Sequence, residues 1–302
     1  RQNASEGLAP SEFFVARLSR NILSESSIGA IFTNGDPHSD LDNTLAGVDF
    51  RYLNTRLSNG GTLQGSLWYQ QSDSEGMDDD QAAYGVSMKF PSRVGLRYGF
   101  TYKELQENFY PALGFVSRTN VRDLTVEFGY AWYPASGPFQ STYSGIDYQR
   151  IETLDDDLQS QLVSIRAFEG STSAGDRIGI HYILSDEVLE TPFEISDGVI
   201  LPVGEYAFKQ YCLSTGTGPS RRITLAAAYC GGEFFDGDMS APSVQLGWRP
   251  NKHFHFAIGY GVSDIGLPYG SFINRLASFN ADIVFSNTLH WANVLQYDNV
   301  SH

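Results

Sequence analysis

The stretch VRDLTVEFGYAW, residues 121–132, decides the fold class of this chain. From Arg122 onward its residues alternate between two sets. The sets are Leu124, Val126, Phe128, Tyr130 and Trp132 on one side and Asp123, Thr125, Glu127, Gly129 and Ala131 on the other. A period of two residues predicts a β-strand with one apolar and one polar face. Such a strand fits a soluble sandwich, which buries its apolar face against a second sheet, or a membrane barrel, which turns that face to lipid.

The same alternation recurs from end to end of the chain, and we find no convincing helix. It predicts sixteen strands. They are residues 12–20, 27–33, 45–54, 62–71, 82–90, 93–103, 121–132, 140–150, 158–168, 177–184, 205–214, 222–231, 243–248, 254–261, 276–285 and 289–297. Many short strands separated by turn residues predict an all-β fold.

The connections between these segments alternate between short and long. The short ones are residues 21–26, 57–61, 91–92, 133–138, 169–176, 215–221, 249–253 and 286–288, and the long ones are 34–43, 72–81, 104–120, 151–157, 185–204, 232–239 and 262–275. In an antiparallel meander the two kinds lie at opposite ends of the strands. Outer-membrane barrels show this asymmetry, with short periplasmic turns and long extracellular loops. The sequence therefore predicts an antiparallel transmembrane β-barrel of the bacterial outer membrane, with residues 1–302 as a single barrel domain.

The expected topology also predicts strands beyond the two ends of this sequence. If the short turns are periplasmic, the first strand runs inward and the sixteenth runs outward. A bacterial barrel normally starts and finishes in the periplasm, so we expect a further strand before Arg1 and another after His302. The chain is then a fragment of a barrel of about 18 or more strands.

Charge and hydropathy narrow the class of protein further. Apolar runs such as ITLAAAYC, residues 223–230, are shorter than the about 18 residues that a membrane-spanning helix needs. The net charge of −15 argues against a nucleic-acid partner. Acidic residues gather in the long connections, as at 78–80 and 155–157. They are either a solvated surface or an acidic rim that would hold Ca²⁺ or Mg²⁺ against lipopolysaccharide, and we expect no other cofactor.

The two cysteines flank the turn-like segment TGTGPS, residues 215–220. A hairpin centred near Thr217 and Gly218 would place Cys230 about 23 Å from Cys212. A disulfide needs Cα atoms within about 7 Å of each other. We therefore expect two unpaired thiols.

Three segments together resemble a known family. They are NFYPALGFVSRTNVRDL at 108–124, TPFEISDGVILPVGEY at 191–206 and WANVLQYDNVS at 291–301. They are similar to the large uncharacterised outer-membrane barrels that follow a family-9-like carbohydrate-binding domain. The resemblance covers most of the chain and implies fold and location rather than activity, because the barrel region of that family is a domain of unknown function. It also implies an N-terminal binding domain and further strands outside this chain.

Charged residues on the predicted lumen side would set the selectivity of a pore or form ion-pair ladders in a plugged barrel. The pore-lining candidates are Asp49, Arg51, Trp68, Arg97, Asp123, Glu127, Arg177, His181 and Asp282. Other residues expected on that side are Lys89, Lys103, Arg222, His255, His290 and Asp298. The indole of Trp68 would either stack on a sugar or pack within the protein.

The connection 104–120 contains a motif of loop-shaping residues, Asn108, Pro111, Gly114, Phe115 and Arg118. Proline and glycine set tight backbone geometry in such a loop. The loop would form a ligand constriction or a partner contact. Alternatively it folds onto the barrel mouth, with Phe109, Tyr110 and Phe115 packed and Arg118 paired with an acid.

No sequence motif of catalysis or metal binding is present. The chain lacks HExxH, a GxSxG elbow and a glycine-rich phosphate loop, so we expect neither an enzyme nor a metal site among its strands. The first hypothesis is a pore or a surface-binding and uptake protein for glycans or other nutrients. The alternative is a structural subunit of a cell-envelope complex with a plugged lumen, and a soluble β-sandwich or lectin is a third reading. The expected partners are membrane lipid, lipopolysaccharide, a glycan ligand and envelope proteins.

Overall fold

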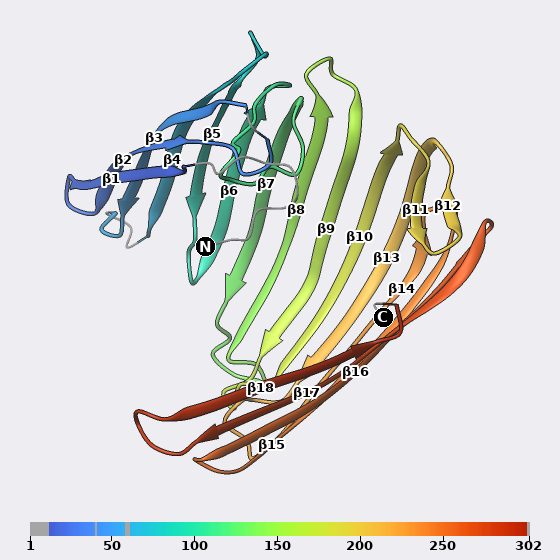
Figure 1. Ribbon diagram of the computed structural model, residues 1–302. Helices are drawn as coiled ribbons and strands as arrows, with labels where there is room; N and C mark the ends of the chain where they lie inside the picture. The colour runs from blue at the N-terminus through green and yellow to red at the C-terminus, as the bar shows by residue number, and fades with distance from the viewer. Residues whose placement is uncertain (1–11, 40, 58–60, 301–302) are drawn as a thin grey trace. The chain divides into compact units, whose positions relative to one another are not determined.

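The computed structural model describes residues 12–39, 41–57 and 61–300, and these residues form β-strands and no helix. Sixteen strands make one antiparallel sheet in chain order, and β11 and β12 make a separate two-stranded sheet (Figure 1). Each of the sixteen predicted segments overlaps one strand of the large sheet. The prediction of an all-β chain with sixteen antiparallel strands in one sheet is thus confirmed, while β11 and β12 lie in a segment predicted as a connection. Within the described ranges, no helix is long and apolar enough to cross a membrane.

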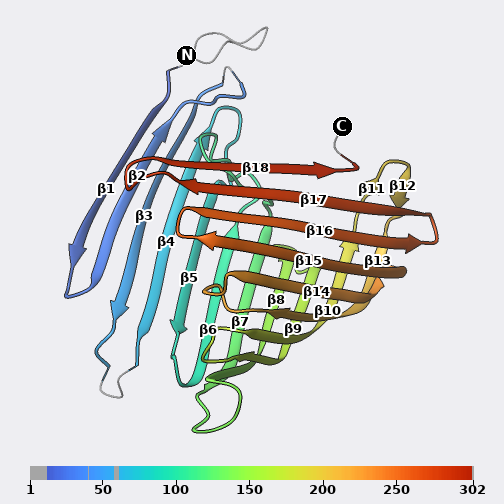
Figure 2. The same cartoon turned by 90° about the horizontal axis from the view of Figure 1, so that it is seen from below.

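The chain divides into two compact units. The first unit is Arg1–Phe128 with Tyr148–Gln159, and the second unit is Gly129–Asp147 with Ser160–His302. The strands are β1 (Phe14–Ile22), β2 (Ser26–Asn34), β3 (Asn43–Asn54), β4 (Leu63–Ser74), β5 (Ala82–Phe90), β6 (Gly95–Leu105), β7 (Val121–Trp132), β8 (Ser141–Thr153), β9 (Leu158–Ser171), β10 (Arg177–Leu189), β11 (Phe193–Ser196), β12 (Val199–Leu201), β13 (Gly204–Gly216), β14 (Ile223–Phe234), β15 (Gly237–Asn251), β16 (Phe254–Leu267), β17 (Gly270–Val284) and β18 (His290–Asp298). Figure 2 shows β15 to β18 as successive neighbours.

The strand register assigns side chains to two faces, because residues directly opposite each other share a face. In the first unit Asp49 lies opposite Gly29 and Trp68, on what we call the polar face. In the second unit one row of the polar face is Ser214, Ala228, Ser243 and Gly261. The opposite surface, which we call the apolar face, carries residues such as Val48 and Tyr69 in the first unit and Leu213 and Tyr229 in the second.

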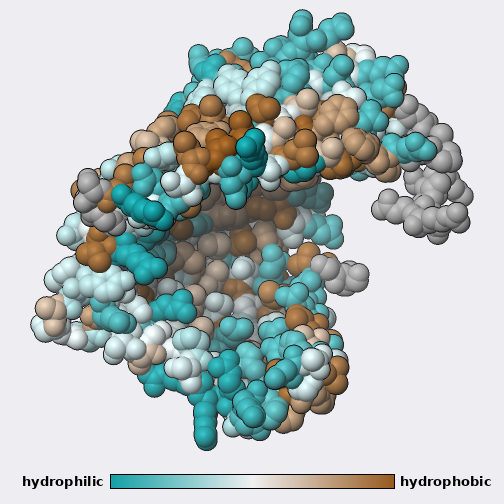
Figure 3. Space-filling view, turned by 90° about the vertical axis from the view of Figure 1, so that its left-hand side faces the viewer, coloured by the Kyte–Doolittle hydropathy of each residue, from teal (hydrophilic) through white to brown (hydrophobic). Residues whose placement is uncertain are grey.

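Large side chains of the apolar face are exposed rather than packed. Leu67, Phe128 and Ile258 are each more than half exposed. Three of the four tryptophans, Trp132, Trp248 and Trp291, lie near the strand ends on this face and are about half exposed as well. Hydrophobic residues accordingly reach the surface in patches beside hydrophilic ones (Figure 3).

Two small clusters of buried apolar residues form instead on the polar faces. In the first unit Leu45, Ala83 and Phe109 make one cluster. In the second unit the other cluster consists of Val199, Leu201, Ile265 and Leu267. Each cluster lies where a connecting segment folds back over the strands.

The predicted alternation of short and long connections holds only in part. Residues 106–120 and 190–203 are long, but the expected loops 232–239 and 262–275 are mostly strand. Phe234 pairs with Gly237, and Leu267 pairs with Gly270, so each turn has two residues. The prediction was wrong there because polar residues at strand ends resemble a loop in sequence, while backbone pairing across the hairpin continues through them.

The expectation of two free thiols is also wrong. Cys212 and Cys230 lie directly opposite each other on β13 and β14 and form a disulfide, with Cα atoms 4.1 Å apart. The hairpin is centred on residue 221, because Gly216 lies opposite Ala226. Placing the centre at Thr217 and Gly218 had displaced the register by several residues, which is enough to separate two cysteines that in fact face each other.

Candidate functional site

Ion pairs cross the polar face of the first unit from strand to strand. The Nζ of Lys89 lies 2.6 Å from the Oε1 of Glu127, and the Nζ of Lys103 lies 2.9 Å from the Oδ2 of Asp123. Asp123 is only 5% exposed, and the side-chain amide of Gln149 donates to both of its carboxylate oxygens at 3.1 Å. Two predicted site residues are therefore held by cations from other strands: Asp123 by Lys103 of the neighbouring strand β6, and Glu127 by Lys89 of β5, two strands away.

Asp49 also forms ion pairs on the polar face of the first unit. An Nη of Arg17 lies 2.5 Å from its Oδ2, and the Nε of Arg51 lies 4.0 Å from its Oδ1. The Arg51 side chain is 75% exposed, so its guanidinium extends over the polar face rather than into the protein. Arg97 lies on the same face by alternation along β6 and is exposed. Arg17 was not among the predicted site residues, although the alternation within β1 would have identified it.

Trp68 is a packing residue in the first unit. It lies opposite Gly85, and a Cβ atom at Gly85 would stand 2.7 Å from the indole Nε1. The indole therefore fills the space above that glycine. It also packs against the cluster of Leu45, Ala83 and Phe109. Of the two expectations for Trp68, packing and sugar stacking, the structure favours packing.

The polar face of the second unit carries its own ion pairs. His181 Nε2 lies 3.0 Å from Glu169 Oε1. Arg166 makes a bidentate contact with Asp147, and its guanidinium carbon lies 5.1 Å from the ring centre of Tyr143. The sequence prediction included His181 but missed the other four residues, because only register shows which residues on neighbouring strands are opposite each other.

Asp282 lies between two histidines on the polar face of the second unit. Its Oδ2 is 3.2 Å from His255 Nδ1, and its Oδ1 is 3.7 Å from His290 Nε2. Among the described residues, no group of three His, Cys, Asp or Glu side chains has the arrangement that would hold a metal ion. Arg177 stands apart from this group at the start of β10, where it is exposed.

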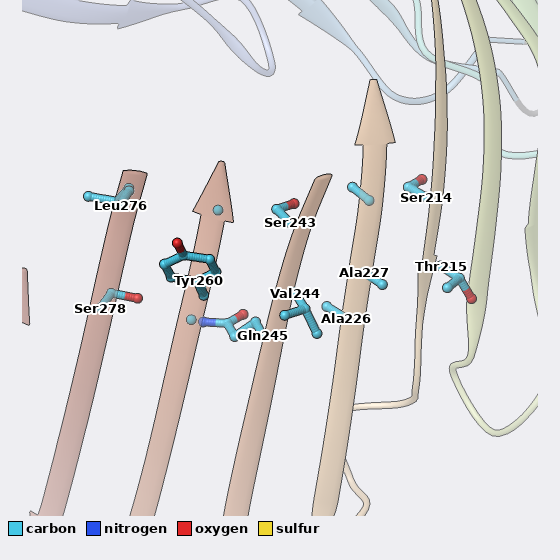
Figure 4. A pocket seen from close by; sticks show the side chains of 13 residues that line it. Ser214, Thr215, Ala226, Ala227, Ser243, Val244, Gln245, Tyr260, Leu276 and Ser278 are labelled. Atoms are coloured by element: carbon cyan, nitrogen blue, oxygen red, sulfur yellow. The ribbon is translucent and has the colours of Figure 1, made fainter. Parts of the chain in front are cut away.

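Other parts of the polar face of the second unit carry small side chains. A shallow depression over β13 to β17 is lined by residues from five neighbouring strands (Figure 4). On the polar face its lining is Ser214, Ala226, Ala228, Ser243, Gln245, Gly259, Gly261, Leu276 and Ser278. Apart from Gln245 and Leu276 these are small residues, so the surface offers hydroxyl groups and open space but no convergent set of reactive side chains.

The connecting segment 106–120, here called the inner loop, covers part of the polar face of the first unit. Two buried polar side chains hold it, Asn43 at 2% exposure and Ser72 at 1%. The Asn43 amide donates to the Tyr110 carbonyl at 2.9 Å and accepts from the Ala112 N–H at 3.4 Å. The Ser72 hydroxyl accepts from the Tyr110 N–H at 3.1 Å.

The loop-motif residues have different environments within the inner loop. Asn108 donates from its side-chain amide to the Asp79 carbonyl at 2.8 Å, and the Gly114 N–H donates to the Pro111 carbonyl at 2.7 Å. Phe115 is 89% exposed, so the expectation that it packs is wrong. Arg118 is exposed as well. The apolar contact is instead supplied by Phe109, which is 3% exposed.

The hairpin of β11 and β12, here called the short hairpin, covers the polar face of the second unit. Val199 and Leu201 of β12 are 6% and 0% exposed. They pack against Ile265 and Leu267 of β16, with Phe272 beside them. The alternative that residues 104–120 fold onto the sheet agrees with the structure of the first unit, and the short hairpin lies over the sheet in the second unit as well.

A polar network not predicted from the sequence lies on the apolar face, at the loop end of β5 to β8. The hydroxyl groups of Tyr84 and Tyr102 donate to Glu104 at 2.6 and 2.8 Å. Arg122 lies 3.7 Å from Glu104 and also contacts Asp156. This network marks where the apolar surface of the first unit ends.

Two loop carboxylates have lowered pKa values. Burial by itself would raise the pKa of Asp36, but hydrogen bonds from the Ser39 hydroxyl and the His38 N–H outweigh it, so the pKa is lowered. In the turn after β9, hydrogen bonds from Arg221 and from the Gly218 N–H lower the pKa of Asp176. Both acids are therefore ionised acceptors that fix their loops at neutral pH.

Each unit presents paired charges and small polar groups on its polar face. The predicted site residues lie on the predicted face of the sheet, but they do not converge on one point. No protein-family model matches the sequence, and no curated protein or solved structure is similar enough to identify a family. The family resemblance and the functions that it implies therefore stay predictions.

Proposed function

We propose that this chain is a membrane-spanning sheet of an outer-membrane β-barrel and that its polar face lines a passage for hydrophilic solutes. The observation that carries the proposal is the pairing of an exposed apolar face with a charged polar face. Monomeric soluble proteins rarely expose contiguous apolar surface of this extent. In a barrel the same surface meets lipid while the opposite face meets water.

The height of the apolar surface supports a membrane setting. On β7 it runs from Leu124 to Trp132, about 27 Å along the strand at 3.4 Å per residue. A tilt of about 40° reduces this to roughly 20 Å, close to the apolar band of about 25 Å in such barrels. Arg122 lies beyond one end of the surface, and Trp132 lies at the other, where aromatic residues favour the membrane interface.

A soluble β-sandwich or lectin has less support than a membrane barrel. A β-sandwich would cover the apolar face with a second sheet. Among the described residues the only second sheet is the short hairpin, and its buried residues contact the polar face of the second unit. A lectin or soluble sandwich would therefore leave the apolar face uncovered.

The disulfide between Cys212 and Cys230 supports a location outside the cytoplasm. Disulfides persist in oxidising compartments such as the periplasm and the cell surface, and they are rare in the cytosol. Membrane lipid and lipopolysaccharide are then the immediate partners, and Ca²⁺ or Mg²⁺ at the exposed acidic residues 78–80 remains a prediction. Glycans among the solutes are suggested by the family resemblance alone.

The test is single-channel conductance of the detergent-purified, full-length protein in a planar lipid bilayer. Stable, ohmic current steps would support a passage for solutes. Absence of steps from protein whose insertion and folding are verified would contradict it. Partition of the protein into aqueous buffer without detergent would overturn the membrane setting itself.

A second candidate is a structural subunit of an envelope complex with a closed lumen. The observation that favours it is that the inner loop and the short hairpin both cover a polar face. This candidate predicts folded, inserted protein without conductance and a stable complex with another envelope protein. The conductance measurement therefore separates the two functions.

A further inference from the structure

We infer that the inner loop is the constriction of the proposed passage and that Phe115 is a side chain that passing solutes meet. The inference rests on the proposed function and adds a size-determining element to it. Its basis is the side of the sheet on which the loop lies, the way it is held there and the exposure of Phe115.

The side of the sheet follows from the contacts of Phe109. This residue is 3% exposed and packs against Leu45 and Ala83. Leu45 lies opposite Ser72 and Ala83 lies opposite Gln70, all on the polar face. In a barrel the polar face borders the lumen, so a loop packed on it occupies space that solutes would otherwise use.

The loop is held in place by contacts that would be costly to release. Asn43 binds both the carbonyl of Tyr110 and the N–H of Ala112, and it also donates to the Ser74 hydroxyl at 2.8 Å. Moving the loop away would leave these buried polar groups without partners, which proteins avoid. The loop is therefore a fixed element of the wall at neutral pH.

Phe115 is an exposed side chain of the inner loop. The hydrogen bond from Gly114 to Pro111 closes a tight turn directly before it, and 89% of Phe115 is exposed. A large apolar side chain that its own unit leaves in water is costly to hydrate and narrows any space beside it. Hydrophobic constrictions are one way in which channels control passage.

The experiment uses a single introduced thiol. The chain has two cysteines, and both are in the disulfide, so Phe115→Cys provides the one free thiol of this chain. A charged, membrane-impermeant methanethiosulfonate reagent is added to single channels of the full-length variant. We expect a stepwise loss of current in each modified channel. Leu23→Cys is the matched control, because Leu23 is 74% exposed in the turn between β1 and β2, at the other end of the strands from the inner loop, where modification should leave the current unchanged.

In a second variant, residues 111–116 are replaced by a short glycine-serine linker. This variant distinguishes failure of the constriction inference from failure of the proposed passage. Conductance of this variant roughly twofold above wild type supports the constriction. A third outcome is that the wild type conducts, that modification of Phe115→Cys leaves the current unchanged, and that the linker variant has the wild-type conductance. This outcome overturns the inference but supports the passage. Wild-type silence with a conducting replacement variant supports the loop as a barrier and overturns the open passage. Silence of both folded proteins overturns both proposals.

Discussion

The inner loop and the short hairpin cover the polar faces of their units by different physical means. Buried hydrogen bonds from Asn43 and Ser72 hold the inner loop, with Phe109 as its main apolar contact. Packing of Val199 and Leu201 holds the short hairpin. A net hydrogen bond contributes about 0.5–1.5 kcal/mol and specifies geometry, whereas a buried leucine contributes about 1.5–3 kcal/mol with little direction. The inner loop is therefore the more exactly placed of the two, and the short hairpin depends more on single side chains.

The largest expected effect is the loss of packing at Leu201, which holds the short hairpin but not the inner loop. Leu201→Ala should weaken the docking of the short hairpin by about 2–5 kcal/mol, because the side chain is 0% exposed. Amide hydrogen exchange of β11 and β12 would report the loss, with the inner loop unchanged. Ile200→Ala is the matched control, since Ile200 is 51% exposed in the same strand. Equal effects of the two substitutions would show that packing does not hold the hairpin.

The disulfide distinguishes the second unit from the first. Replacing Cys212 and Cys230 together by serine should lower its stability by about 3 kcal/mol, because the bond closes a loop with a sequence separation of 18 residues. Urea unfolding in detergent, followed by exchange of the β13 and β14 amides, measures this change. Unchanged stability, or native thiols that react with an alkylating reagent without reduction, would mean that the pair is not bonded.

The hydrogen bonds of Asn43 are predicted to hold the inner loop in place. Asn43→Ala should loosen the inner loop by about 1–3 kcal/mol, because it leaves the Tyr110 carbonyl and the Ala112 N–H without a partner. Limited proteolysis within residues 106–120 is the measurement. In the control Asn54→Ala, the lost amide donates to the Tyr52 hydroxyl and accepts from the Arg56 N–H, and neither partner belongs to the inner loop. Cleavage at the same rate in both variants would contradict the role of Asn43.

The smallest expected effect is a pH dependence of the stability of the inner loop. Asp36 accepts a hydrogen bond from the Tyr110 hydroxyl at 3.4 Å, and its pKa is lowered. Its contribution is present above the ordinary pKa of about 3.9 and is lost as the pH falls through the lowered value. Exchange of the inner-loop amides should therefore increase in acid more than in the Asp36→Asn variant. An identical acid response in both proteins would exclude Asp36 as the cause.

Much of the fold could be predicted from the sequence because a strand's side chains alternate with a period of two. The boundaries of β5 and β7 were predicted to the residue, and Asp49, Trp68 and Asp282 lie on the expected face. Each of these inferences needs only the order of residues within one strand. Nothing about a neighbouring strand enters them.

Predictions that depended on how two strands pair were less successful. The register of β13 and β14 pairs Cys212 with Cys230, and a displacement of a few residues in the turn was enough to hide it. Arg166 was missed as the partner of Asp147 for the same reason. Pairing depends on where each turn closes, and several turns are compatible with the same polar segment.

The sequence by itself determined that this chain is an all-β, antiparallel sheet with one apolar and one charged face, because those properties follow from local alternation. Only the tertiary structure decided which charges meet, that the two cysteines join, and that residues 106–120 and the short hairpin cover the polar faces. These features depend on contacts between residues far apart in the chain. Their free energies come from register, burial and hydrogen-bond geometry, which no single stretch of sequence contains.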